Sequence, residues 1–280
     1  MQFILKFCFS FAMMLAMLSI ALPAQAANQA ASVQTAQPMP QAAELKHETV
    51  AANSNRCLAL LHVEDYQAAI AACTQALQLD PQAAEARLNR GLAYYRQAHF
   101  RAAIADYNRL LAIQPDDFRA YYNRGLAELA LERYQVSLAD FNQALQSDLP
   151  TPAEAEVLME RGLAYLMLER VESAIADFTQ AIQTDQTLER AYYNRACAYH
   201  QRGDSWAALA DFDRVLALVP SDPQAHFSRG RLRQQLGDPR GAMQDLRQAA
   251  QTFQRQGQMM AYEAVRQWIS HIQSHQTAIG

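Results

Sequence analysis

Glycine is scarce in this 280-residue sequence, with nine residues. Cationic side chains do not outnumber acidic ones. Few glycines together with many Ala, Leu, Gln and Glu residues favour helix along the whole chain. The formal net charge is −4, which argues against a protein that binds nucleic acid.

Sequence motifs for enzymatic chemistry are missing as well. The chain has no G-x-G-x-x-G or P-loop that would cradle a phosphate, and no G-x-S-x-G elbow. We therefore expect no catalytic residue, no cofactor and no metal site. His271 and His275 are four residues apart, but no acidic residue accompanies them, so we interpret them as part of a frayed tail. An enzyme or small-molecule receptor stays an alternative, which an enclosed apolar pocket with convergent polar groups would favour.

A long apolar run occurs only at the N-terminus. Lys6 precedes an apolar stretch from Phe7 to Leu22, and Ala24-Gln25-Ala26 has the small-residue pattern of a secretory cleavage site. We expect residues 1–26 to be a signal peptide and the mature chain to be periplasmic, lumenal or secreted, with an uncleaved membrane anchor as the alternative. Residues 27–49 are rich in Ala, Gln and Pro and are expected to form a flexible leader.

A repeat with a period of 34 residues fills most of the remaining chain. A small residue follows an Arg at spacings of 34, 34, 37, 34 and 34, namely at Cys57, Gly91, Gly125, Gly162, Ala196 and Gly230. A second small residue stands twelve positions later, at Ala69, Ala103, Ser137, Ala174, Ala208 and Ala242. An aromatic residue follows in four units, at Tyr107, Phe141, Phe178 and Phe212, and several units end near a proline.

This pattern resembles the tetratricopeptide repeat (TPR) family, in six units. The resemblance implies an all-α fold, a right-handed superhelical solenoid of antiparallel helical hairpins that stack because one hairpin cannot bury its own apolar face. The expected repeats are 50–83, 84–117, 118–154 with a three-residue insertion, 155–188, 189–222 and 223–256. Residues 257–280 are expected to hold a capping helix, since Ala261, Val265, Trp268, Ile269 and Ile272 have helical spacing. A partner-binding amphipathic helix is the alternative.

The recurring residues also predict contacts inside each hairpin. We expect Gly91 to face Ala103 and Gly125 to face Ser137, where the two helices approach closely. An Arg in the first helix and an Asp in the second are expected to pair between helices, with a cation ladder for an anionic ligand as the alternative. The arginines are Arg56, Arg90, Arg124, Arg161, Arg195 and Arg229, and the aspartates are Asp106, Asp140, Asp177, Asp211 and Asp245, with Ala72 in the first unit.

The same register makes a prediction for the cysteines that remain after signal cleavage. Cys57 would face Ala69, and Cys73 would face Asn53, one helical turn away. That offset is expected to exceed the Cα separation that a disulfide tolerates. We therefore predict that Cys57 and Cys73 are buried thiols, and that Cys197 is a third.

The family resemblance implies a binding surface, because the first helices of TPR hairpins line the concave side where peptides are held. Amide side chains there can bond to a peptide backbone, and apolar rows supply contact area. Packing between neighbouring first helices is the alternative for the aromatic rows. We expect Leu92, Leu126 and Leu163 to be reached by water and to contribute more to binding than to stability. The expected peptide-binding residues are Asn55, Asn89, Asn123, Asn194, Leu88, Leu92, Tyr95, Tyr122, Leu126, Met159, Leu163, Tyr193 and Phe227.

These features predict a non-catalytic scaffold that binds a protein or peptide partner outside the cytoplasm. The partner is expected to be an exported or membrane-complex protein; no nucleic acid is expected, and membrane contact only through an uncleaved signal segment. Asn123 matches an Asn with which co-chaperone members bind a C-terminal carboxylate, but the matching cationic positions are neutral, which favours an apolar segment instead. Self-association through the ends of the array is the alternative, and light scattering with and without residues 258–280 would distinguish it.

Overall fold

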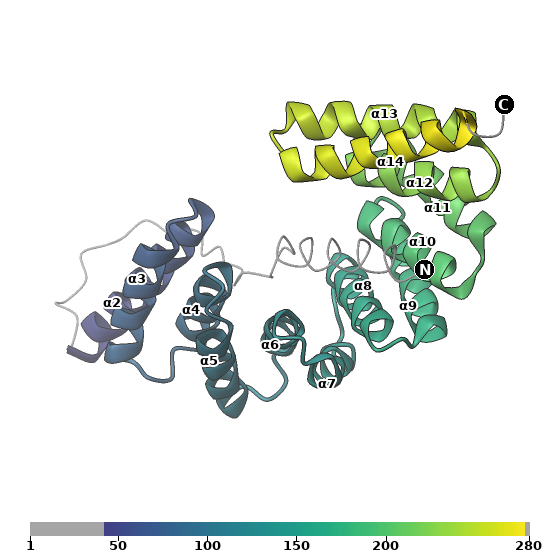
Figure 1. Cartoon of the computed structure of the whole chain (residues 1–280). Helices are drawn as coiled ribbons and strands as arrows, with labels where there is room; N and C mark the ends of the chain where they lie inside the picture. The colour runs from purple at the N-terminus through teal and green to yellow at the C-terminus, as the bar shows by residue number, and fades with distance from the viewer. Residues whose placement is uncertain (1–41, 278–280) are drawn as a thin grey trace, which may run out of the picture. The chain divides into compact units, whose positions relative to one another are not determined.

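A computed structural model describes residues 42–277, in which thirteen α-helices and no strand occur (Figure 1). The predicted signal peptide and most of the predicted leader lie outside the described residues. Among the described helices, none is both long and apolar enough to cross a membrane. The all-α prediction is confirmed.

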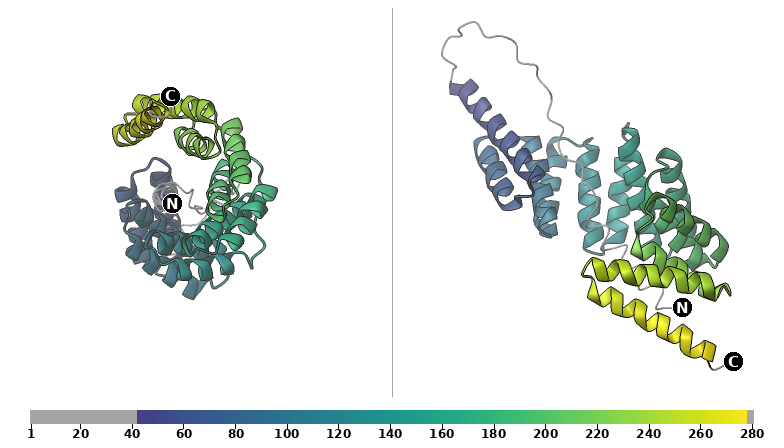
Figure 2. Two further views of the ribbon diagram at one scale, coloured as in Figure 1. Left: turned by 45° about the vertical axis from the view of Figure 1, so that its right-hand side comes forward. Right: turned by 90° about the horizontal axis from the view of Figure 1, so that it is seen from above.

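The chain divides between Ala153 and Glu154 into two compact units, which we describe separately as the N-terminal and C-terminal units. Within each unit, consecutive helices lie side by side (Figure 2). The helices of the N-terminal unit are α2 (Ala42–His62), α3 (Tyr66–Leu79), α4 (Ala84–Arg96), α5 (Phe100–Ile113), α6 (Phe118–Ala130) and α7 (Tyr134–Ala144). Those that follow are α8 (Thr151–Met167), α9 (Val171–Thr184), α10 (Glu189–Arg202), α11 (Ser205–Leu218), α12 (Pro223–Gln235), α13 (Pro239–Arg255) and α14 (Met259–Thr277).

The N-terminal unit consists of three helical hairpins. The even-numbered helix of each pair packs against the next helix, and the first two hairpins each stack on the one that follows. We call the first helix of a hairpin the A helix and the second the B helix. Helix α2 begins at Ala42, so residues 42–49, expected in the flexible leader, are helical.

The C-terminal unit continues the same plan and ends in a single helix. Helices α10 and α11 form one hairpin and α12 and α13 another, and α14 packs against α13. Val265 and Ile272 of α14 are fully buried in a cluster with Phe253 of α13 and Phe227 of α12. The predicted capping helix is therefore confirmed: it covers the apolar face of the last hairpin, as a stacked array requires.

Local signals mark the ends of these helices. Asp222 caps α12 by accepting hydrogen bonds from the backbone N–H groups of Gln224 and Ala225, and Asp238 caps α13 by accepting one from Gly241. In both helices a proline occupies the first turn, where its missing N–H costs nothing. Each A helix ends in a turn whose residue has positive φ, at Glu64, Ala98, Glu132, Glu169, Gly203 and Gly237.

In three hairpins the glycine of the A helix, at Gly91, Gly125 or Gly162, lies closest to an aromatic ring, whereas Gly230 lies against the Ala242 carbonyl and Leu246. The nearest neighbours predicted for Gly91 and Gly125 are therefore wrong. A Cβ atom on Gly91 would lie 2.5 Å from Tyr107 Cε1, and one on Gly125 would lie 2.7 Å from Phe141 Cε1. Both rings are fully buried. The glycine therefore makes room for a ring sixteen positions further along the chain, which the B helix inserts against the A helix.

The predicted Arg–Asp pairs are confirmed in five hairpins, and they reach further than expected. Arg124 donates through Nε and Nη2 to both oxygens of Asp140, at 2.9 and 2.6 Å, and through Nη1 to Asn108 of the preceding B helix at 2.7 Å. Such a clasp joins three helices, because a planar guanidinium offers donors in several directions. Corresponding Arg–Asp bonds occur at Arg90–Asp106, Arg161–Asp177, Arg195–Asp211 and Arg229–Asp245.

The first hairpin is held differently, by a disulfide between Cys57 and Cys73 with a Cα–Cα distance of 5.3 Å. The prediction of two thiols here is wrong, for the same reason as the register. Cys57 occupies the glycine position and Cys73 the aromatic position, which face each other directly. Cys197 remains a buried thiol.

Candidate functional site

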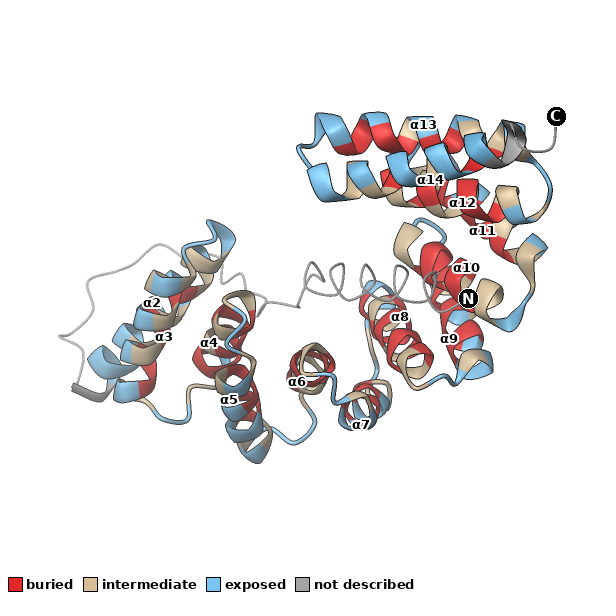
Figure 3. Ribbon diagram, in the orientation of Figure 1, coloured by how far each residue is buried: buried red, intermediate tan, exposed pale blue. Residues whose placement is uncertain are grey.

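The predicted binding residues lie on one face of the A helices, which we call the A-helix face. Asn55 on α2 is exposed, whereas the other twelve predicted residues are buried. Figure 3 shows along each helix which residues are buried, intermediate or exposed. Leu92, Leu126 and Leu163 are at most 4% exposed, so the expectation that water reaches them is wrong for this structure. Spacing places a residue on a helix face but does not show how far its neighbours cover it.

In the N-terminal unit, aromatic contacts and an ion-pair chain cross the A-helix face. Tyr122 of α6 packs at a tilt against Phe141, with ring centroids 6.2 Å apart. Arg119 of α6 bridges two carboxylates, Asp117 at 2.8 Å and Glu85 of the preceding A helix at 3.0 Å. Burial lowers the pKa of Arg119, but the hydrogen bonds to these carboxylates outweigh it and raise the pKa above its usual value. The guanidinium therefore stays charged and links two repeats.

In the C-terminal unit, the polar members of the A-helix face bond across repeats. The Asn194 amide nitrogen lies 3.6 Å from Met159 Sδ, one repeat earlier. The Tyr193 hydroxyl lies 3.1 Å from the Ser228 hydroxyl, one repeat later, and its ring meets Phe212 edge-on. At least in this unit, residues that were predicted to contact a ligand also join neighbouring A helices.

A carboxylate pair on α8 faces one arginine of α10. Arg190 donates to Glu160 at 2.9 Å, and it lies 3.9 Å from Glu156. The Glu160 side chain is fully buried. Burial raises the pKa of Glu156, Arg190 opposes this, and the charge of Glu160 reinforces it. Because Glu156 and Glu160 share the single cation Arg190, this region of the A-helix face has an excess of carboxylate oxygens that can accept hydrogen bonds.

A cation and aromatic residues meet where the A-helix face ends. The Arg231 guanidinium of α12 lies 4.6 Å from the ring centroid of Trp268 on α14 and 5.5 Å from that of Phe227. These distances suit cation–π attraction. The charge of Arg231 also acts on His200 of α10. Burial lowers the pKa of His200, and the positive charge of Arg231 lowers it further. This histidine is therefore neutral at pH 7.

Sequence reasoning missed Glu156, Glu160 and Arg190, although two signals were present. Glu160 occupies the position that is Asn in four other repeats. Glu156 and Arg190 hold the same repeat position 34 residues apart, as do Glu85 and Arg119. Opposite charges at one position of consecutive repeats predict a bridge between A helices.

Comparison with protein families identifies the class of protein. Models of the tetratricopeptide repeat match residues 63–97, 96–158, 155–187 and 189–222, which together span more than half of the chain. The chain belongs to the tetratricopeptide repeat family, whose members are generally non-catalytic interaction scaffolds.

Solved structures support the fold. PilW, a type IV pilus biogenesis factor, is 20% identical with a TM-score of 0.70, over 77% of this chain and 97% of that one. PilF of Pseudomonas aeruginosa is 18% identical with a TM-score of 0.67, over 79% of this chain and 98% of that one. YrrB, a TPR protein with an unusual peptide-binding site, is 19% identical with a TM-score of 0.54, over 69% and 97% of the two chains. A search of curated proteins finds no match by sequence.

Proposed function

We propose that the mature chain is an exported, non-catalytic scaffold that binds a protein or peptide segment on its A-helix face. The observation that carries this proposal is that some repeat positions keep the same residue type while others vary. The small residue, Arg, Asp and aromatic recur because each hairpin needs them, as the clasp of Arg124 and the ring of Phe141 illustrate. By contrast, one row of the A-helix face holds four different residue types in successive repeats: Leu88, Tyr122, Met159, Tyr193 and Phe227.

Positions that vary while the hairpin stays constant are available to specify a partner. Asn and apolar side chains on this face would supply backbone hydrogen bonds and contact area. We keep the thirteen predicted residues as the proposed site and add Glu156, Glu160 and Arg190 to it. A partner reaches the buried members only if the covering side chains move, so the bound and free chains should differ here.

Export is supported by the N-terminal sequence and by the disulfide between Cys57 and Cys73, because disulfides persist in oxidising compartments. Intact-mass measurement of the protein from its native compartment should give a chain that starts at or near Ala27. A mass that retains Met1 would contradict cleavage.

The binding proposal is tested by comparing two sets of carboxamide substitutions. The first changes Asn89, Asn123 and Asn194 on the A-helix face to Ala. The matched control changes Gln75, Gln143 and Gln180, which are exposed on B helices, to Ala.

Each mature variant is used to purify interacting proteins from the native compartment, after thermal melting confirms that it is folded. We expect the first set to lose a partner that the parent and the control retain. Equal recovery by both sets would show that the A-helix face is not the binding surface.

A further inference from the structure

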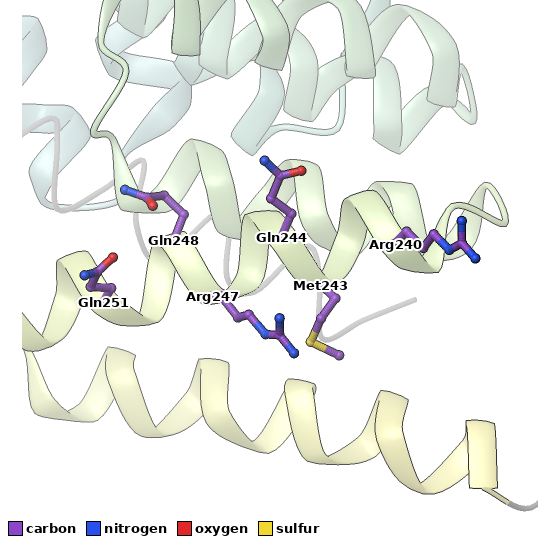
Figure 4. A pocket seen from close by; sticks show the side chains of 6 residues that line it. All are labelled: Arg240, Met243, Gln244, Arg247, Gln248 and Gln251. Atoms are coloured by element: carbon purple, nitrogen blue, oxygen red, sulfur yellow. The ribbon is translucent and has the colours of Figure 1, made fainter.

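One stripe of residues follows the outer face of α13. Arg240, Gln244, Arg247, Gln248 and Gln251 recur at the i, i+4, i+7, i+8 and i+11 positions of this helix, and with Met243 they line a pocket (Figure 4). Arg240, Gln244, Arg247 and Gln251 are exposed. We call these five polar residues the α13 stripe.

The α13 stripe departs from the pattern of the other repeats. At the position of Arg247, four earlier B helices carry an acceptor that receives the clasp arginine of the next repeat, as Asn108 does from Arg124. The other three acceptors are Thr74, Thr179 and Asp213. Gln244 likewise stands where the other five B helices have alanine. The needs of the hairpin therefore do not account for either residue.

The stripe is cationic and carries no acid. Among the described residues, neither Arg240 nor Arg247 forms an ion pair within 4.0 Å. Asp245 of the same helix is buried and engaged by Arg229 and Arg233.

The surrounding sequence reinforces this charge. Residues 223–277 contain seven arginines and three acidic residues, whereas residues 42–222 contain 16 Lys and Arg against 25 Asp and Glu. The last hairpin and its capping helix are thus the positive part of an otherwise acidic chain.

We propose that the α13 stripe binds an extended acidic peptide segment with two carboxylates three residues apart. Seven residues of helix separate Arg240 from Arg247, a rise of about 10.5 Å. Three residues of a polyproline II segment make one turn and span about 9 Å, so both carboxylates lie on one side and each guanidinium can meet one of them in a forked hydrogen bond. The three glutamines lie alongside and can bond to the peptide backbone. This surface belongs to a B helix and is distinct from the A-helix face of the proposed function.

The test uses a short fluorescein-labelled Gly/Ser peptide that carries two aspartates three residues apart, and its asparagine counterpart. Fluorescence anisotropy at low salt compares the mature parent with R240E/R247E. The matched control is R101E/R109E on α5, which makes the same change of charge at two exposed positions of another B helix.

We expect the aspartate peptide to bind the parent and the control alike. R240E/R247E should bind about tenfold more weakly, the effect of two exposed ion pairs. Equal weakening in the control, or equal binding of the asparagine peptide, would overturn the proposal. Binding that is unchanged when the two aspartates are made adjacent would overturn the proposed spacing. Circular dichroism of both variants excludes loss of the fold as the cause.

Discussion

Reduction of the Cys57–Cys73 disulfide should loosen the first hairpin and leave the C-terminal unit unchanged. This hairpin depends on the bond more than its neighbours would, because it lacks both devices that hold the others. Arg56 is exposed, Ala72 stands at the repeat position of the aspartate, and the cysteines replace the glycine and the ring. The disulfide joins residues 16 apart in sequence. Closing a loop of this length removes chain entropy equivalent to about 3 kcal/mol from the unfolded state.

Hydrogen exchange measured by mass spectrometry can read this effect locally. A loss of about 3 kcal/mol corresponds to roughly a hundredfold faster exchange in peptides from α2 and α3. Peptides from α10 and α11 are the internal control, since Cys197 is already a thiol there. Unchanged exchange in α2 and α3 after reduction would refute the reasoning. So would a count of three reactive thiols, instead of one, in the unfolded and non-reduced mature chain.

A rescue variant tests whether the disulfide replaces the usual devices. Cys57→Gly with Cys73→Phe installs the glycine and the ring, and Ala72→Asp supplies a partner for Arg56. We expect this triple variant to exchange more slowly in α2 and α3 than C57A/C73A does. If it exchanges as fast, the disulfide is not equivalent to the clasp and the ring.

Three further predictions concern buried polar groups. The Tyr107 hydroxyl is buried without a partner among the described residues, and burial raises its pKa well above the usual value. Tyr107→Phe should therefore raise the free energy of unfolding by about 1 kcal/mol in urea titrations, and a decrease in that free energy would reveal an unseen partner. Arg124→Ala leaves Asp140 buried and unpaired and should cost about 3 kcal/mol, against about 1 kcal/mol for Asn108→Ala, which removes only the link to the preceding repeat; equal costs would contradict the clasp. Burial would raise the pKa of Asp245, but hydrogen bonds from His226 and Arg229 lower this pKa below its ordinary value near 3.8. The stability that the Asp245 carboxylate contributes is therefore present above pH 3.8 and is lost as the pH falls further. In acid titrations the parent should lose more stability than Asp245→Asn, and parallel curves would count against this prediction.

The repeat period determined most of the architecture without coordinates. Each hairpin needs the same small, charged and aromatic residues, so those residues recur every 34 positions and reveal the helices, the turns and the Arg–Asp pairs. Helix ends at Asp222 and Asp238 were equally readable, because a cap depends only on neighbours in the chain. The capping helix followed from the helical spacing of its apolar residues.

Only the tertiary structure decided which residues oppose each other across a hairpin and how far the A-helix face is covered. Spacing locates a residue along a helix, but the rotation of two packed helices about their axes and the turn between them set the partner. That is why Tyr107 is the nearest neighbour of Gly91, and why Cys57 reaches Cys73. The burial of Leu126 has a similar origin: solvent exposure depends on everything that packs over a face, which comes from residues distant in sequence.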